Sequence, residues 1–170
     1  MSFESDLLAL LPYLRRYARA LTGDPAWADD LVQDTLERAL SKGRWRADGS
    51  LRAWLLTLLR HRFIDQLRAR REVATDCDDA VWQDWAAPAG EAGGLMLRDV
   101  QRALYRLPVE QREVLLLVAL EGLSYQETAA VLAVPVGTVM SRLARAREQM
   151  RVWLDEPAAR PPVLQMVKKA

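Results

Sequence analysis

Apolar residues recur at three- and four-residue steps along nearly the whole chain, and this helical period constrains the fold more than any other feature. The first segment shows it with Phe3, Leu7, Leu10, Leu14, Tyr17 and Leu21. Such spacing places the apolar side chains on one face of an α-helix, where they can be buried together. The pattern therefore predicts an all-α protein.

Local signals predict where the first helices end. Gly23 ends the first helix, which we expect to be bent or restarted at Pro12. Asp24-Pro25 supplies an N-cap and a first-turn proline for a second helix that runs to about Ser41. In the third segment, an apolar stripe that begins at Leu51 meets an arginine at position 62. We interpret this as a helix, a turn around Arg60-His61-Arg62, and a second helix that ends in the basic run at 68–71.

Composition changes sharply over residues 72–94. This stretch holds six acids, no lysine or arginine, one proline and three glycines. It cannot bury enough apolar surface to offset the entropy of ordering it, so we expect a flexible acidic linker. The predicted organisation is two small helical bundles, residues 1–71 and 95–155, and a tail at 156–170 without assigned structure.

The C-terminal bundle has the proportions of a helix-turn-helix. Ser124 and Glu127 form a capping box that opens a short helix, the chain breaks at Val134-Pro135, and a longer helix follows over about 137–154. One face of the longer helix is apolar and is expected to pack inward. The face expected to be exposed carries Thr138, Ser141, Arg142, Arg145 and Gln149.

The exposed residue types suit nucleic acid. An arginine can grip a guanine edge with two hydrogen bonds or hold a phosphate, and hydroxyls near a helix N-terminus suit phosphates. From Thr138 to Arg151 there are four arginines and one glutamate. The alternative from these residues alone is a solvated basic face on a bundle helix, so the outline leaves DNA binding open.

A second basic stretch spans residues 44–71, with eight arginines and two aspartates. Trp45, Trp54 and Phe63 are interleaved with them, and positive charge combined with aromatic surfaces is typical of sites for single-stranded nucleic acid. Trp54 lies on the apolar stripe and is better interpreted as core, whereas Trp45 lies off any stripe.

Composition excludes several classes of function. The net charge is only +1, so the distribution of charge matters more than its total. There is a single cysteine and a single histidine, no cluster with metal-ligand spacing, no nucleophile elbow and no phosphate-binding glycine loop. No stretch approaches the roughly 18 apolar residues of a membrane span, and no signal peptide opens the chain. We expect a cytoplasmic protein without metal or cofactor, and not an enzyme.

Three segments carry a resemblance to a known family. DDLVQDTLERAL, SLRAWLLTLLRHRFIDQLRARR and LPVEQREVLLLVALEGLSYQETAAVLAVPVGTVMSRLARAREQM resemble, in order and spacing, the extracytoplasmic-function (ECF) sigma factors of bacterial RNA polymerase. The beginning, SFESDLLALLPYLRRYARALTG, is similar to the subgroup tied to general stress responses in alphaproteobacteria.

The resemblance implies partners and roles. It implies a promoter-recognition subunit, monomeric when free, that binds core RNA polymerase and promoter DNA under the control of an anti-sigma protein. The implied polymerase-binding residues are Asp30, Leu31, Gln33, Asp34 and Glu37. The implied −10 residues are Trp45, Arg60, His61, Arg62 and Arg68, with His61 where many relatives have asparagine. The implied −35 residues are the five exposed on the last helix, Thr138, Ser141, Arg142, Arg145 and Gln149.

Two alternatives remain beside this interpretation. A stand-alone helix-turn-helix regulator needs a sensor domain, and the arginine-rich N-terminal half suits that role poorly. A sigma-like decoy that only titrates an anti-sigma protein has no need of DNA-facing arginines, yet Arg142 and Arg145 are present.

Overall fold

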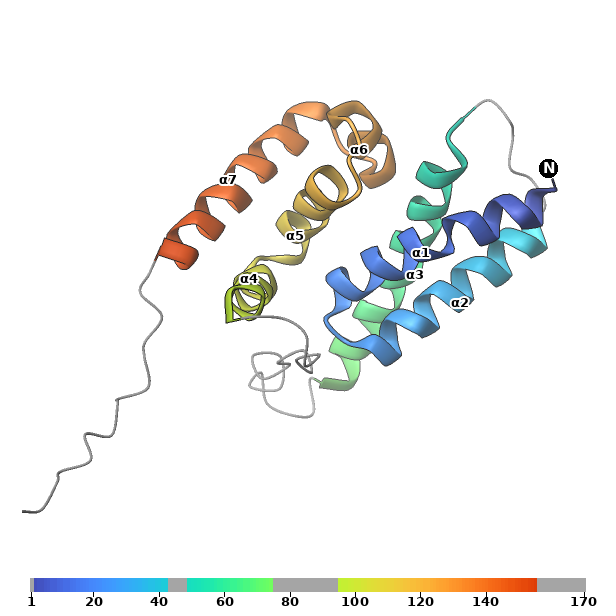
Figure 1. Cartoon of the computed structure of the whole chain (residues 1–170), viewed down its shortest axis with the longest axis horizontal. Helices are drawn as coiled ribbons and strands as arrows, with labels where there is room; N and C mark the ends of the chain where they lie inside the picture. Colours follow the sequence, from blue (N-terminus) through green and yellow to red (C-terminus); the bar gives the residue numbers. More distant parts are fainter. Residues whose placement is uncertain (1, 43–48, 75–94, 156–170) are drawn as a thin grey trace, which may run out of the picture.

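The computed structural model describes residues 2–42, 49–74 and 95–155, and every regular element within these ranges is helical (Figure 1). Three helices form the N-terminal half: α1 (Phe3–Thr22), α2 (Pro25–Lys42) and α3 (Leu51–Ala74). The C-terminal half holds α4 (Leu95–Arg106), α5 (Val109–Leu115), a π-helical segment η2 (Leu116–Leu120), α6 (Tyr125–Leu132) and α7 (Val136–Asp155). The expected all-α fold with two helical bundles is confirmed. The expected linker, apart from its first three residues, and the tail lie outside the described residues.

The ends of α1 and α2 follow the predicted capping signals. Gly23 adopts a left-handed conformation with φ 72° and donates its N–H to the Arg19 carbonyl (2.9 Å). The Asp24 carboxylate then accepts hydrogen bonds from the N–H groups of Ala26 (2.9 Å) and Trp27 (3.2 Å). Of the two expectations for Pro12, a bend or a restart, the restart is wrong, because α1 is one helix through this residue. Pro12 is exposed, so the carbonyl that loses its partner there can be hydrated.

Helix α3 corrects the expected turn around Arg60-His61-Arg62. It is one helix of 24 residues. The stripe that is buried runs at four-residue steps through Leu55, Leu59, Phe63 and Leu67. This buried stripe passes Arg60 and Arg62 without a break. The apolar stripe that begins at Leu51 and meets Arg62 is therefore not the one that the fold follows, and the turn predicted from it is absent. Trp54, expected to be core, is half-buried and lies against Phe3, with ring centroids 6.5 Å apart.

The C-terminal half builds the predicted helix-turn-helix. Gly122, with φ 66°, ends the preceding turn, and the capping box forms: the Ser124 hydroxyl accepts from the Glu127 N–H (3.1 Å) while the Glu127 carboxylate accepts from the Ser124 N–H (2.8 Å). Helices α6 and α7 then meet at a bend of 102°, within the range typical of DNA-binding helix pairs.

The buried side chains of the two halves form one cluster. Helix α3 packs against α6, and α1 packs against η2, so the halves touch directly (Figure 1). Among the described helices, none alone is long and apolar enough to span a membrane, and α6 with α7 meets that criterion only as a bent pair.

Candidate nucleic-acid interfaces and the contact between the halves

The predicted apolar face of α7 packs inward and thereby fixes the opposite face outward. Val139, Leu143 and Ala146 are fully buried. Residues three, four and seven positions apart share a face of a helix, so Thr138, Ser141, Arg142 and Arg145 lie on a common side. Arg145 and Ser141 are exposed, whereas Thr138 and Arg142 are half-buried.

Two of these residues have contacts within the domain. The Arg142 guanidinium lies 4.0 Å from the Glu110 carboxylate, an ion pair at the edge of α5. The Gln149 side chain has its carbonyl oxygen buried without a hydrogen-bond partner in the described part of the chain. Gln149 is therefore turned partly into the domain, unlike the exposed residue that the sequence predicted.

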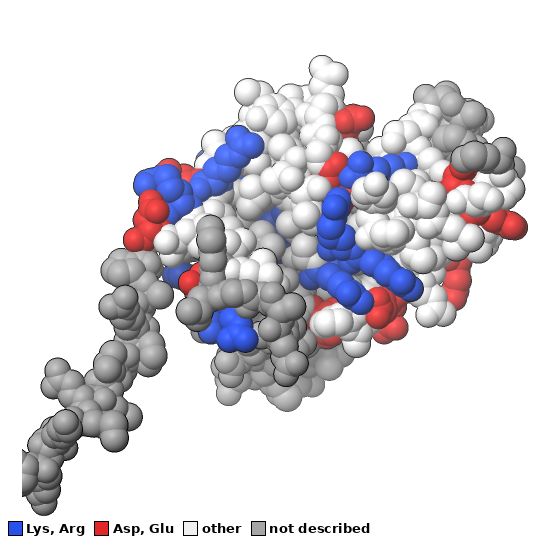
Figure 2. Space-filling view, in the orientation of Figure 1, with Lys and Arg blue, Asp and Glu red and all other residues white. Residues whose placement is uncertain are grey.

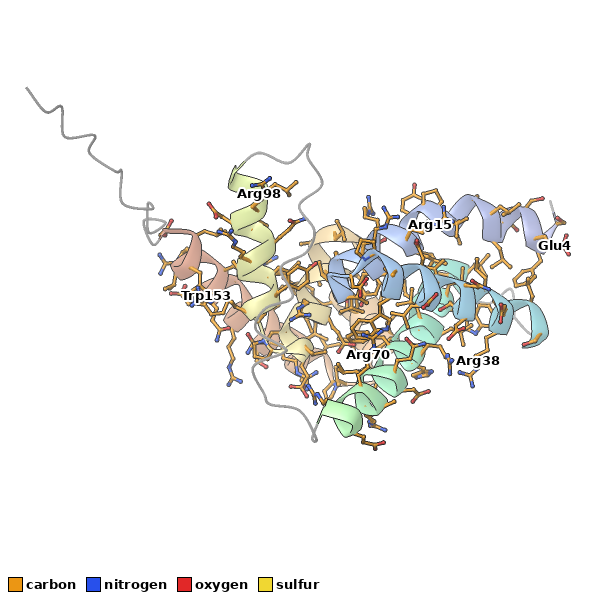
Figure 3. The ribbon with its side chains drawn as sticks, turned by 90° about the horizontal axis from the view of Figure 1, so that it is seen from below. Glu4, Arg15, Arg38, Arg70, Arg98 and Trp153 are labelled. Carbon is orange, nitrogen blue, oxygen red and sulfur yellow. The ribbon has the colours of Figure 1, made fainter. Side chains whose placement is uncertain are left out.

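A pocket on α3 brings together part of the predicted −10 set. Arg60, His61 and Arg68 line a hollow of about 400 Å³, together with Leu58, Ile64 and Asp65 of the same helix. Arg38 reaches it from α2 (Figure 3). Three arginines and a histidine line the hollow beside a single carboxylate, that of Asp65, so it suits an anionic or hydrogen-bonding ligand.

Arg62 does not join this pocket. It points toward α2 and donates from Nη2 to Asp34 Oδ2 at 2.7 Å, where Gln66 also donates (3.0 Å). Neighbours in sequence lie about 100° apart around a helix axis, so Arg62 is turned away from His61 and toward Asp34 of α2. Trp45 lies outside the described residues.

Four of the implied polymerase-binding residues, Asp30, Gln33, Asp34 and Glu37, form an acidic ridge on α2 that is exposed except at Asp34. Asp30, Gln33 and Glu37 are exposed, and the Gln33 amide donates to the Glu37 carboxylate (3.1 Å). Asp34 is half-buried in its pair with Arg62. Leu31 is fully buried, so its side chain belongs to the core and not to a surface available to a partner.

Glu113 of α5 lies at the contact between the halves, and its side chain is fully buried. Its Oε1 accepts from Arg60 Nε at 3.0 Å, and the Arg60 side chain is 19% exposed. Burial raises the pKa of the Glu113 carboxyl, while the Arg60 guanidinium acts in the opposite direction. The nearby Tyr17 hydroxyl is also buried, without a hydrogen-bond partner among the described residues, and burial raises its pKa.

Glu121, which follows η2, forms the second ionic contact. Arg16 of α1 donates to its Oε1 (3.2 Å), and Arg52 of α3 pairs with its Oε2. The same arginines reach the backbone: Arg16 donates to the Leu120 carbonyl and Arg52 to that of Glu121. Both are partly exposed, at 47% and 28%, whereas the Glu121 side chain is fully buried.

A third contact joins the corner between α4 and α5 to the end of α1. The Arg112 guanidinium donates to the carbonyls of Leu104, Tyr105 and Leu107 in its own half and to Leu21 in the other (3.0 Å). Burial lowers the pKa of Arg112. The Tyr105 hydroxyl donates to the Arg19 carbonyl at 3.2 Å. Figure 2 shows basic side chains gathered where the two halves meet.

Sequence reasoning missed this contact and also Arg38; of the charged residues in the contact it named only Arg60, and that as a −10 residue. Glu113 and Glu121 flank the apolar run VLLLVAL. Acidic residues so close to a buried helix need cationic partners, and this was the one indication in the sequence that the two glutamates form ion pairs. Nothing local identified which arginines supply them.

Two family profiles match the chain, one in each half. The profile described as Sigma-70, region 4, matches residues 97–150. The one described as Sigma2 domain of PhyR matches residues 7–60. The first contains the helix-turn-helix, and the second contains α2 and the first part of α3.

Similar proteins span most of both lengths. The chain is 39% identical over 154 residues to the ECF RNA polymerase sigma factor EcfG of Rhodopseudomonas palustris, covering 90% of this chain and 85% of that protein. It is 39% identical over 133 residues to the ECF RNA polymerase sigma factor SigC of Mycobacterium tuberculosis, covering 77% and 72%.

Solved structures agree. The sigma factor RpoE from Bartonella quintana, in complex with the anti-sigma factor NepR, superposes with a TM-score of 0.80 at 37% identity, covering 89% of this chain and 96% of that one. The PhyR–NepR complex from Sphingomonas gives a TM-score of 0.64 at 27% identity, covering 95% and 96%.

The helix-turn-helix and these similarities define a promoter-recognition class of protein. The chain belongs to the ECF sigma factors of RNA polymerase.

Proposed function

We propose that this chain binds core RNA polymerase and directs it to promoters by reading a −10 element with its N-terminal half and a −35 element with its C-terminal half. The observation that carries the proposal is the presence of two separate basic faces, on α3 and α7, in halves that match two different family profiles. Its role is recognition in the cytoplasm, where the polymerase works, and not catalysis.

The −35 assignment uses the exposed side of α7. Arg145 projects into solvent, and Arg142 has only a long contact with an exposed Glu110. Both side chains can therefore bind base edges or phosphates in a major groove, with Arg142 giving up its contact to Glu110. Ser141 and Thr138, in the first turns of α7, add hydroxyls suited to phosphates. Gln149, with its buried oxygen, contributes least.

The −10 assignment uses the pocket on α3. Arg60, His61 and Arg68 surround a hollow that is large enough for an extruded base. Bases that leave the stack need stacking and hydrogen bonds to offset the lost stacking energy, a few kcal/mol. Arg38 joins this assignment, and Arg62 leaves it because of its pair with Asp34.

The polymerase assignment uses the ridge of α2, without the buried Leu31. Asp30, Gln33 and Glu37 present exposed acidic or amide groups in successive turns, and Asp34 lies between them. Such a ridge suits a basic, helical partner surface.

An anti-sigma protein completes the proposed set of partners. The similar RpoE structure contains the anti-sigma factor NepR, which supports a protein antagonist that covers the surfaces used by polymerase.

In-vitro transcription with purified core polymerase on genomic DNA tests the proposal. Wild-type protein is expected to give discrete start sites. The triple variant Asp30→Ala, Gln33→Ala, Asp34→Ala is expected to give none. Its helical content and its binding to an antagonist are measured separately, to show that the variant is folded. A control triple change on the exposed side of α1, Glu4→Ala, Ser5→Ala and Ala9→Ser, should retain the start sites. Tight binding of the free chain to one duplex operator, unaffected by the α2 changes, would favour a stand-alone regulator.

A decoy is the second candidate, because the matching N-terminal profile is named for a domain of PhyR. PhyR is called an anti-anti-sigma factor in a structural neighbour that shares 22% identity, a likeness of fold alone. A decoy would bind the antagonist and give no start sites with core polymerase, so the same transcription assay separates the two.

A further inference from the structure

Two fully buried carboxylates of the C-terminal half take their charged partners from the N-terminal half. Glu113 pairs with Arg60, and Glu121 pairs with Arg16 and Arg52. A buried carboxylate without a cation is strongly disfavoured. These pairs therefore exist only while the two halves are in contact, and separation requires each carboxylate to find water instead.

The contact between the halves contains polar groups beside the buried apolar cluster that spans both halves. Besides the ion pairs, Arg112 donates across it to the Leu21 carbonyl, and Tyr105 donates to the Arg19 carbonyl. Interfaces between domains of one chain that open and close are more polar than permanent ones. Because both halves belong to one chain, the contact forms at an effective concentration on the order of mM, which favours closure in the free protein.

Arg60 is the point of conflict between this contact and DNA binding. It lines the α3 pocket, yet its Nε is used by Glu113 and its side chain is 19% exposed. An arginine held by a buried carboxylate is not available to a base or a phosphate. We propose that Glu113 and Glu121 form an internal latch that keeps the free chain closed and withholds Arg60 from promoter DNA, so that polymerase binding must open the chain. The withholding of Arg60 rests on the proposed −10 function; the closure itself does not.

The distance between the halves tests closure directly. Spin labels at two exposed helical positions, Ala9→Cys in α1 and Ala144→Cys in α7, are placed in a Cys77→Ser background. The free chain is expected to give one narrow distance distribution. Glu113→Gln or Glu121→Gln should add a longer, broader population, as should saturation of the unchanged chain with core polymerase.

Binding to a fluorescent single-stranded −10 oligonucleotide tests the withholding. Glu113→Gln, assayed without spin labels, should bind at least threefold more tightly than the unchanged chain. Glu148→Gln is the matched control, because its exposed ion pair with Arg151 lies within α7 and does not cross between the halves. It should change neither the distances nor the affinity.

An unfolded variant would also give a long, broad distance distribution, so the helical content of each variant is measured by circular dichroism. If Glu113→Gln loses its helices, Glu121→Gln decides, because its arginine partners are already partly exposed. A broad distance distribution in the unchanged chain, or a narrow one in every folded variant, overturns the latch. Opening without tighter oligonucleotide binding overturns the withholding of Arg60. Start sites in the transcription assay report on the proposed function separately.

Discussion

Arg62 and Arg145 differ in their partners, although both lie on basic stretches of helix. Arg145 projects from α7 into solvent. Arg62 forms a 2.7 Å ion pair with Asp34 and helps to hold α3 against α2. The sequence predicted both as DNA contacts, since charge and spacing alone do not show which guanidinium meets a carboxylate from another helix. At this scale the capped and apolar positions were predictable, and the partners of the charges were not.

Replacing Arg142 or Arg145 by alanine is expected to weaken −35 recognition. A bidentate base contact is worth roughly 1–3 kcal/mol, and its loss should relax specificity at one position. A contact to phosphate alone would weaken binding to all sequences alike and lower the salt slope by about one. Holoenzyme binding to a panel of −35 variants, at several salt concentrations, measures both. Unchanged promoter activity in the double alanine variant would contradict the assignment.

His61→Asn is expected to shift the preferred −10 base, because the imidazole lies in the pocket on α3 and asparagine presents a different set of donors and acceptors. His61→Ala should weaken discrimination instead. The comparison variant is Arg62→Ala, the next residue along, whose side chain pairs with Asp34 and does not line the pocket. Loss of this ion pair should lower stability by about 1 kcal/mol or less and leave base preference unchanged. Transcription from a panel of −10 variants checks this. Identical preferences for all four proteins would remove His61 from recognition.

At the scale of the elements, helix ends were predicted well and the interior of α3 was not. The caps at Gly23, Asp24 and Ser124 are local: a few neighbouring residues determine them. The stripe of α3 depends on its neighbours in the fold. Leu51 and Trp54 are only half-buried, whereas Leu55 and Leu59 are fully buried. A periodic pattern shows that a helix has an apolar face, but only packing shows how that face turns along its length.

Ser124→Ala is expected to destabilise the helix-turn-helix by about 1 kcal/mol, because it removes the hydroxyl that accepts the Glu127 N–H. The hydrogen bond from the Ser124 backbone lowers the pKa of the Glu127 carboxyl. A carboxyl with a lowered folded pKa stabilises the fold above its ordinary pKa and loses that contribution as the pH falls through the lowered value. Urea unfolding at neutral and acidic pH measures the effect, and Glu127→Gln should flatten this pH dependence. Ser41→Ala is the control, since that hydroxyl only donates to a carbonyl at the end of α2. An equal loss in both serine variants would contradict the capping role.

At the scale of the whole molecule, the contact between the halves is what sequence reasoning did not foresee. Arg60 and Glu113 are 53 positions apart, and Arg16 and Glu121 are 105 apart. No periodic or capping signal connects residues at such separations. The contact explains why Glu113 and Glu121 lie buried beside the core: the other bundle covers them, while their arginine partners stay partly exposed. The two bundles were predictable separately, and their relation was not.

Substitution of Gly23 tests whether the two halves are in contact in solution. A side chain at this position would be disfavoured for two reasons, the backbone conformation and the space available. The Gly23 φ of +72° disfavours other residues, and a Cβ there would lie 2.8 Å from the Tyr105 ring of the other half. Gly122 has a similar φ of +66° but nothing within 4 Å of such a Cβ. Gly122→Ala should therefore lower the free energy of unfolding only by the backbone penalty, roughly 1–2 kcal/mol. Gly23→Ala should lower it by more, because the Tyr105 ring must move and the hydrogen bond from its hydroxyl to the Arg19 carbonyl is lost. Thermal unfolding of both variants, alone and with Tyr105→Ala, separates the two terms: the excess at Gly23 should disappear when the ring is absent. Equal costs at the two glycines would mean that Tyr105 does not press on Gly23 in solution, and that the halves stand further apart than in the closed structure.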